Sequence, residues 1–174
     1  MTTLFLQRFG AGAFLMLALG LGVSAMAQPT TGDADWKEAD VPPPPAFDVN
    51  KLVLFEVSSQ AALVYGIDPA TVQISKPDDI VRYVMVASSA SGARNVLYQG
   101  LRCATGEYKT YARYYAEGGW KMTGETGWAS LFGTNASLPA RRLAQAGACD
   151  GRAIPLTVRE LVTSVKSSVL KADH

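Results

Sequence analysis

Two cysteines, Cys103 and Cys149, offer the clearest chemistry in this 174-residue sequence. They are the only cysteines, and their wide separation lacks the C-x-x-C spacing of redox and zinc motifs. A reactive thiol or a pair of metal ligands are the alternatives to a bridge. An even number of cysteines in an exported chain favours a disulfide bond. Closing a loop of this size would stabilise the fold by about 4 kcal/mol in the chain-entropy model.

Histidine chemistry is nearly absent, because the one histidine is the last residue, His174. Chain ends fray, so Ser-His-Asp, Cys-His and histidine-zinc catalysis are not available in their usual form. The sequence also has no phosphate-binding loop, dinucleotide fingerprint or C-x-x-C-H haem motif. We therefore expect no catalytic residue of these classes, no metal and no cofactor.

Carboxylates are the remaining candidates for catalysis. Glu107, Glu117 and Glu125 lie on or near predicted strands, and a pair of them would suit glycoside hydrolysis. The alternative is that they are surface charges at turns and edges. Asp78 and Asp79 lack the further spaced acids of a calcium loop. A carboxylate-based hydrolase of cell-wall or glycan substrates is thus the second hypothesis for function.

A basic and aromatic cluster is the strongest indication of binding. On a strand from Glu107 to Tyr115, alternation places Lys109, Tyr111 and Arg113 on one face. Stacking and guanidinium contacts would let such a face bind a glycan, a peptide or an anion. Half-buried packing, with the arginines paired to nearby acids, is the alternative. The candidate binding face comprises Arg94, Arg102, Lys109, Tyr111 and Arg113.

The N-terminal segment is typical of export. Arg8 precedes an apolar run, and Ala25-Met26-Ala27 has the small-x-small ending that a signal peptidase recognises. We predict a signal peptide over residues 1–27, cleaved before Gln28, and a periplasmic location. The alternative is an uncleaved inner-membrane anchor, since the uncharged run approaches the roughly 20 residues that span a bilayer. Glycines within the run and its small-residue ending favour cleavage.

Residues 28–50 are polar and then proline-rich, with Pro42–Pro45 expected to form polyproline II. We interpret them as a stiff spacer, with Trp36 and Phe47 as residues that pin it to the domain. A ligand for a proline-recognising partner is the alternative. The whole chain has 16 basic and 15 acidic residues, and removal of Arg8 leaves none in excess. This balance argues against nucleic acid and membrane surfaces as partners.

Residues 51–174 are expected to form a single α+β domain: an antiparallel meander of strands with C-terminal helices on one face. Helices are predicted over 127–132, over 139–146 with Ser137 as its cap, and at the C-terminus. There Val158, Leu161, Val162, Val165 and Val169 form one apolar stripe, and Thr157 with Glu160 a capping box. Strands are expected over 51–57, 62–67, 71–74, 81–87, 95–103 and 107–115.

The central stretch, VRYVMVASSASGARNVLYQGLRCATGEYKTYA over residues 81–112, resembles the CNP1-like family of small exported proteins of Gram-negative bacteria. The resemblance covers roughly residues 36–155, and Cys149 lies where family members carry a second cysteine. Where the family pattern has Glu before Gly100, this chain has Gln99. The resemblance implies an envelope location and a shared fold, and it implies no activity.

Our leading hypothesis for function is an exported envelope protein that acts as a non-catalytic binding or accessory module. Its partner would be an envelope protein or a small ligand.

Overall fold

The computed structural model describes residues 35–124 and 126–172. The predicted signal peptide, the first residues of the predicted spacer, Glu125 and His174 lie outside the described residues. The chain's compact unit begins at Trp36. No helix in the described ranges is long and apolar enough to cross a membrane.

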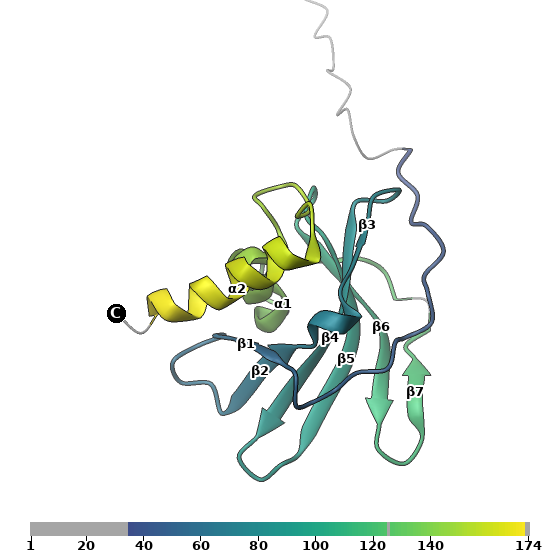
Figure 1. Ribbon diagram of the computed structural model, residues 1–174. Helices are drawn as coiled ribbons and strands as arrows, with labels where there is room; N and C mark the ends of the chain where they lie inside the picture. Colours follow the sequence, from purple (N-terminus) through teal and green to yellow (C-terminus); the bar gives the residue numbers. More distant parts are fainter. Residues whose placement is uncertain (1–34, 125, 173–174) are drawn as a thin grey trace, which may run out of the picture. The chain divides into compact units, whose positions relative to one another are not determined.

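A single antiparallel sheet dominates this unit (Figure 1). Its main path runs β1-β2-β4-β5-β6-β7, while β3 pairs with β4 and β8 pairs with β6. The short connections agree with the predicted meander and confirm the α+β class. The strands are β1 (Val53–Phe55), β2 (Leu63–Ile67), β3 (Gln73–Ser75), β4 (Ile80–Ser89), β5 (Arg94–Arg102), β6 (Glu107–Tyr115), β7 (Gly119–Met122) and β8 (Ala129–Ser130).

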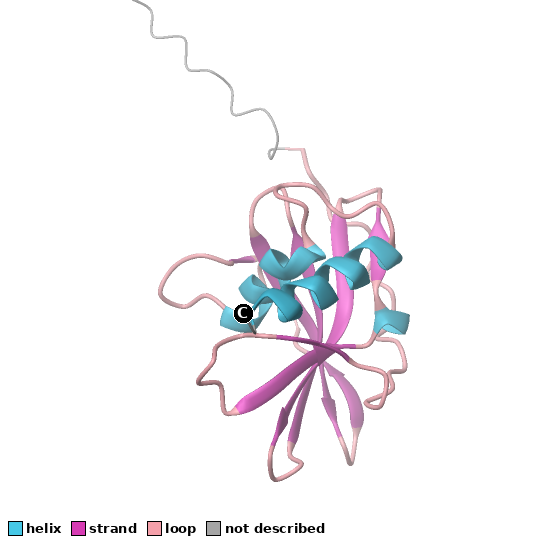
Figure 2. Ribbon diagram, turned by 60° about the vertical axis from the view of Figure 1, so that its left-hand side comes forward, coloured by secondary structure: helices cyan, strands magenta, loops and turns pink. Residues whose placement is uncertain are grey.

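Two helices, α1 (Leu138–Leu143) and α2 (Val158–Ala172), cover one face of the sheet (Figure 2). The predicted cap is present, because the Ser137 hydroxyl accepts a hydrogen bond from the Ala140 N–H. In α2 the predicted stripe faces the sheet, with Leu161 and Val165 fully buried. These helices close an apolar core against Val81, Tyr83, Met85, Leu97 and Leu101 of β4 and β5.

One predicted helix is wrong. Residues 127–132 contain β8, whose Ala129 pairs with Tyr108 of β6. Tertiary pairing outweighs the weak local preference of this Gly-, Ser- and Ala-containing stretch. The Leu131 N–H also donates to the Gly106 carbonyl at 2.8 Å, so this segment is tied to the turn that joins β5 and β6.

An extended segment, residues 36–49, lies on the other face of the sheet, and we call it the strap (Figure 1). Val41 and Phe47 of the strap pack on a second apolar core that includes Val84, Val86 and Tyr98. The domain boundary expected at residue 51 therefore does not coincide with the start of the compact unit. The two faces are covered by chain segments from opposite ends of this unit.

The cysteines form the expected disulfide. Cys103 and Cys149 are bonded, with their Cα atoms 5.6 Å apart. The bond ties the end of β5 to the residue that follows η2 (Ala144–Ala148), the π-helical turn that continues α1, and so it links the sheet to the helical layer.

Candidate functional site

A β-bulge in β6 shapes the face beneath the strap. Tyr98 pairs with Ala112, and the next residue, Gln99, pairs with Thr110, so Tyr111 is the extra residue of the ladder. A bulge breaks the strict alternation of side chains along a strand. The expectation that Arg113 would share a face with Lys109 and Tyr111 assumed uninterrupted alternation. Arg113 is exposed, and its neighbour Tyr114 contacts the strap through Phe47.

Gly100 on β5 makes room for the Tyr111 ring. A Cβ atom at this position would lie 2.5 Å from the Tyr111 hydroxyl oxygen, which is shorter than real Cβ contacts allow. The glycine of the central sequence motif thus serves a close approach between two strands. Its neighbour Gln99 faces the opposite core, where its amide accepts from Tyr83 and donates to Thr110.

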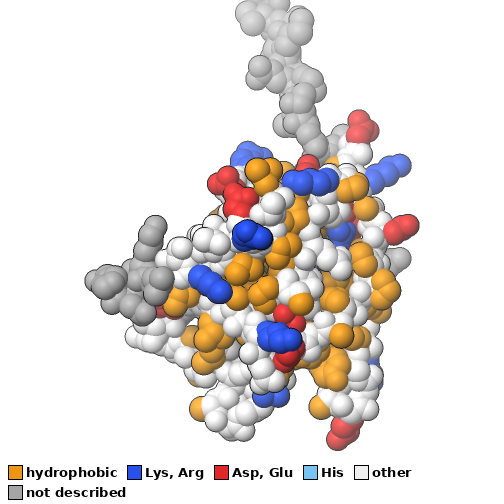
Figure 3. Space-filling model, in the orientation of Figure 1, with side chains coloured by type: hydrophobic (Ala, Val, Ile, Leu, Met, Phe, Trp, Pro, Cys, Tyr) orange, Lys and Arg blue, Asp and Glu red, His pale blue; other side chains and the backbone are white. Residues whose placement is uncertain are grey.

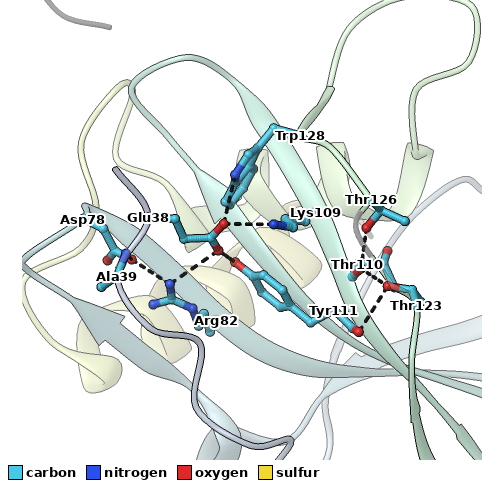
Figure 4. Close-up of polar contacts among 10 residues, drawn as sticks. All are labelled: Glu38, Ala39, Asp78, Arg82, Lys109, Thr110, Tyr111, Thr123, Thr126 and Trp128. Carbon is cyan, nitrogen blue, oxygen red and sulfur yellow. Dashed lines mark hydrogen bonds and ion pairs between the residues drawn. The ribbon is translucent and has the colours of Figure 1, made fainter. Parts of the chain in front are cut away.

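The carboxylate of Glu38, on the strap, is the centre of a polar cluster on this face (Figure 4). It accepts hydrogen bonds from the Tyr111 hydroxyl at 2.6 Å and from the Lys109 Nζ at 3.0 Å. The Trp128 indole N–H also donates to it, at 3.3 Å. A guanidinium nitrogen of Arg82 lies 3.6 Å away. Cationic and aromatic side chains thus enclose one acid from the chain's own N-terminal segment.

Asp78 holds Arg82 from its other side. Its carboxylate lies 2.6 Å from the Arg82 guanidinium and accepts a 3.0 Å hydrogen bond from the Ala39 backbone N–H. Burial is the largest single influence and opposes ionisation of Asp78, but the hydrogen bonds from Arg82, Ser75 and the Ala39 N–H together with the charge of Arg82 outweigh it, so the pKa of Asp78 lies below its ordinary value. Two carboxylates and two cations therefore compensate one another under the strap.

Tyr111 is placed to donate rather than to ionise. Burial raises its pKa, and the hydrogen bond to the Glu38 carboxylate raises it further. The phenol therefore stays protonated at any pH near neutrality and acts as a hydrogen-bond donor to the Glu38 carboxylate.

Trp36 anchors the start of the strap. The guanidinium of Arg102 stacks on its indole ring at 3.7 Å, and its N–H donates to the Asp78 backbone carbonyl at 3.0 Å. Arg102 also forms an ion pair with Glu107 at 3.4 Å. Three residues of the sequence-predicted binding face, Arg102, Lys109 and Tyr111, thus contact the strap.

The other two residues of that face lie elsewhere. Arg94 is exposed and lines a small hollow beside Phe47 and Tyr114, and Arg113 is exposed opposite Leu97 of β5. The structure therefore brings three of the five predicted residues together and covers them with the strap. The five residues therefore do not form one exposed binding face.

Glu107 and Glu117, the two described acids among those considered for catalysis, do not form a facing pair. Glu107 accepts from Thr105 and pairs with Arg102 at the start of β6, whereas Glu117 is exposed in the turn after this nine-residue strand. A strand rises about 3.4 Å per residue, so these carboxylates are too distant to act on one glycosidic bond. Glu38 and Asp78 are closer, but both are held by Arg82 beneath the strap.

An open hollow of about 480 Å³ lies beside the disulfide. The Cys103–Cys149 bond, Leu131 and Phe132 give it apolar walls, and Arg141 and Arg152 are its two cations. Its size lies within the range of roughly 300–1,000 Å³ that is typical of small-molecule sites. Phe132 is 61% exposed, which is unusual for a phenylalanine and leaves an aromatic surface at the opening.

The charged side chains that line this hollow are all positive. No aspartate, glutamate, histidine or free thiol is among its described lining residues. The Arg152 Nε donates to the Ala104 carbonyl at 2.9 Å, which orients its guanidinium. In the described part of the chain the Arg141 side chain has no hydrogen-bond or ion-pair partner. Figure 3 shows apolar side chains over the middle of one face of the molecule, with cationic and acidic side chains scattered among them.

Sequence reasoning missed both Glu38 and the arginines of the hollow. Arg141 lies on a predicted helix and Arg152 in a loop, so no spacing rule connects them. The signal that was available is composition: residues 133–149 contain two arginines and no acid. Glu38 was overlooked because residues 28–50 were interpreted as a spacer.

Comparison with known proteins gives one match. The model of the CNP1-like family matches residues 31–166, which is most of the chain. No curated protein and no solved structure matches it. Within the described residues no group of three or more acidic, histidine or cysteine side chains is arranged to hold a metal ion.

Proposed function

The chain belongs to the CNP1-like family, and from that premise we propose that it is an exported, non-catalytic binding module of the cell envelope. We infer that its ligand is a small amphipathic anion and that it binds in the hollow beside the disulfide.

The observation that carries this proposal is the combination of apolar walls with two arginines in one open hollow. Leu131 and Phe132 offer apolar surface to the body of a ligand, while guanidinium groups suit a carboxylate, sulfate or phosphate. A cationic ligand would be repelled, since no acid lines the hollow to compensate it. The disulfide fixes two walls relative to each other, which reduces the ordering cost of binding.

Binding without catalysis is favoured because no carboxylate, histidine or free thiol is among the described lining residues, and the Thr105 hydroxyl is engaged as a donor to Glu107. Arginine stays protonated and does not transfer protons at neutral pH. The hydrolase hypothesis would need two carboxylates facing a common cleft, and Glu107 and Glu117 lie at opposite ends of β6.

Export is part of the same proposal. An apolar run followed by Ala25-Met26-Ala27 supports cleavage before Gln28 and release into the periplasm. N-terminal sequencing of the protein recovered from a periplasmic fraction should begin at Gln28. Recovery of an intact N-terminus in the membrane fraction would instead support an uncleaved anchor.

The ligand site is tested with 8-anilinonaphthalene-1-sulfonate, an amphipathic anion whose fluorescence rises in apolar surroundings. We expect saturable binding to the native protein that weakens at least about ten-fold in the Arg141→Gln, Arg152→Gln double variant, because both cations are lost. Arg159→Gln is the matched control, since Arg159 is exposed on α2 and does not line the hollow. Equal binding by all three proteins, each with an unchanged melting temperature, would refute the proposed site.

A further inference from the structure

The strap binds the sheet in the manner of a bound peptide. It has no strand or helix of its own, and its described contacts are made largely by side chains at separate points. Trp36 occupies the first point, beneath Arg102, and Glu38 occupies the second, between Lys109 and Tyr111. Lys37 between them is exposed and contacts neither group. This face of the sheet therefore binds an aromatic side chain and, two positions later in the segment, a carboxylate.

The sheet also binds the backbone of the strap. The N–H of Ala39, directly after the carboxylate residue, donates to Asp78. This bond ties the backbone of the segment to Asp78 directly after the carboxylate residue. Aromatic stacking, a carboxylate and one oriented backbone group together define a short linear recognition pattern.

The face also has a donor that the strap does not use. Arg82 is only 2% exposed, and its Nε has no hydrogen-bond partner among the described residues. A buried donor without an acceptor is costly. A segment that supplied one more acceptor at this point would therefore bind better than the strap, and this observation is independent of the strap's own contacts.

We propose that the face beneath the strap is a recognition surface for an acidic segment of a partner protein with the pattern Trp-x-Glu, and that the strap is its resident intramolecular competitor. Charge complementarity determines the partner's chemistry, because Asp78 alone would be left to compensate the two cations Arg82 and Lys109 when the strap leaves. Within the described residues the strap joins the sheet at its C-terminal end, so its release requires movement near the turn at Asp48–Lys51.

Competition between the strap and an added peptide determines how tightly the peptide should bind. A tethered segment has an effective concentration on the order of millimolar, so a free peptide with the same contacts displaces little of an intact strap. Weakening the strap should therefore expose the site without altering the face. The probe is a fluorescently labelled peptide with the sequence of residues 35–47, added to the mature protein.

We expect this peptide to bind the Trp36→Ala, Glu38→Gln protein about ten-fold more tightly than the wild-type protein. The reason is that the intact strap competes with the peptide at a millimolar effective concentration, whereas the weakened strap competes poorly. Should the double variant fail to fold by circular dichroism, the Trp36→Ala variant replaces it, because the Glu38 contacts are then retained. A second peptide with Glu38→Gln should bind about ten-fold more weakly, since it lacks the charge that Lys109 and Arg82 face. Arg159→Gln in the protein, exposed on α2 in the helical layer, should change neither value.

Equal affinity of the peptide for wild-type and weakened protein would overturn the proposal, as would indifference to the Glu38→Gln change in the peptide. A doubled mass by light scattering in the weakened protein, abolished by Lys109→Gln, would assign the face to a second copy of this chain and likewise overturn it. Failure here would leave the hollow beside the disulfide untouched, because no described residue lines both sites.

Discussion

The carboxylate of Glu38 accepts a 2.6 Å hydrogen bond from the hydroxyl of Tyr111, a residue 73 positions further along the chain. This contact joins the N-terminal strap to the bulge of β6. It also explains why a cluster that resembles a binding face in the sequence is closed in the structure. The acid that such a face would recruit is already supplied by the same chain.

Replacing Glu38 with Ala should therefore destabilise the protein by about 1–3 kcal/mol, the usual cost of leaving a buried polar group without its partner, because Lys109 and Tyr111 lose their acceptor while Arg82 keeps Asp78. Urea denaturation followed by Trp fluorescence measures the change. Glu117→Ala, at an exposed turn, is the control and should be near neutral. Equal stability of the two variants would show that the strap contributes little to the fold.

Gly100→Ala should cost about 1–3 kcal/mol, the usual range for overpacking, since its Cβ would collide with the Tyr111 hydroxyl. Adding Tyr111→Phe removes the closest atom of that collision. The double variant should thus be more stable than the sum of the two single losses predicts. Simple additivity in denaturation experiments would argue that the two residues do not meet as described.

Asp78 should control stability in acid. Its pKa is lowered in the folded protein, so its contribution is fully present above the ordinary value of 3.8 and is lost as the pH falls through the lowered value. The Asp78→Asn variant should be less stable at neutral pH and should lose less stability on acidification. Asp79→Asn serves as the control, because Asp79 is exposed beside it. Melting temperatures between pH 2 and pH 7 measure both effects; identical acid profiles for Asp78→Asn and wild type would contradict this role.

The disulfide should contribute about 4 kcal/mol, given the 46-residue separation of its cysteines. The Cys103→Ser, Cys149→Ser double variant removes it without leaving a free thiol. Intact mass before and after reduction should differ by two hydrogens in wild-type protein. Two freely alkylated thiols in protein from the envelope would refute the bond.

Periodicity in the sequence was sufficient to predict the sheet and the C-terminal helix. The strands of the meander and the buried residues Leu161 and Val165 follow from regular alternation and helical spacing. The β8 segment could not be predicted, because Ala129 and Ser130 become a strand only through pairing with β6. Local preference has little weight in so short an element.

The site was less accessible to sequence reasoning. Lys109 and Tyr111 share a face of the sheet, as alternation predicts. The bulge at Tyr111 places Arg113 on the other face, and no residue type in the sequence predicts a bulge at this position. Arg102 was chosen as a binding residue, and its partner Trp36 lies 66 positions upstream in a segment interpreted as a spacer. Contacts of such long range depend on the assembled fold rather than on any local pattern.

The central claim, that the hollow beside the disulfide binds a small amphipathic anion, is tested most directly by amide chemical shifts of the ¹⁵N-labelled mature protein during titration with octanoate. We predict saturable shifts confined to the lining residues Ala104, Gly106, Phe132 and Gly151, with no such shifts on addition of the cation octyltrimethylammonium. The Arg141→Gln, Arg152→Gln variant should lose the response. Shifts that are absent, that lie away from these residues, or that are the same for the anion and the cation would contradict the account.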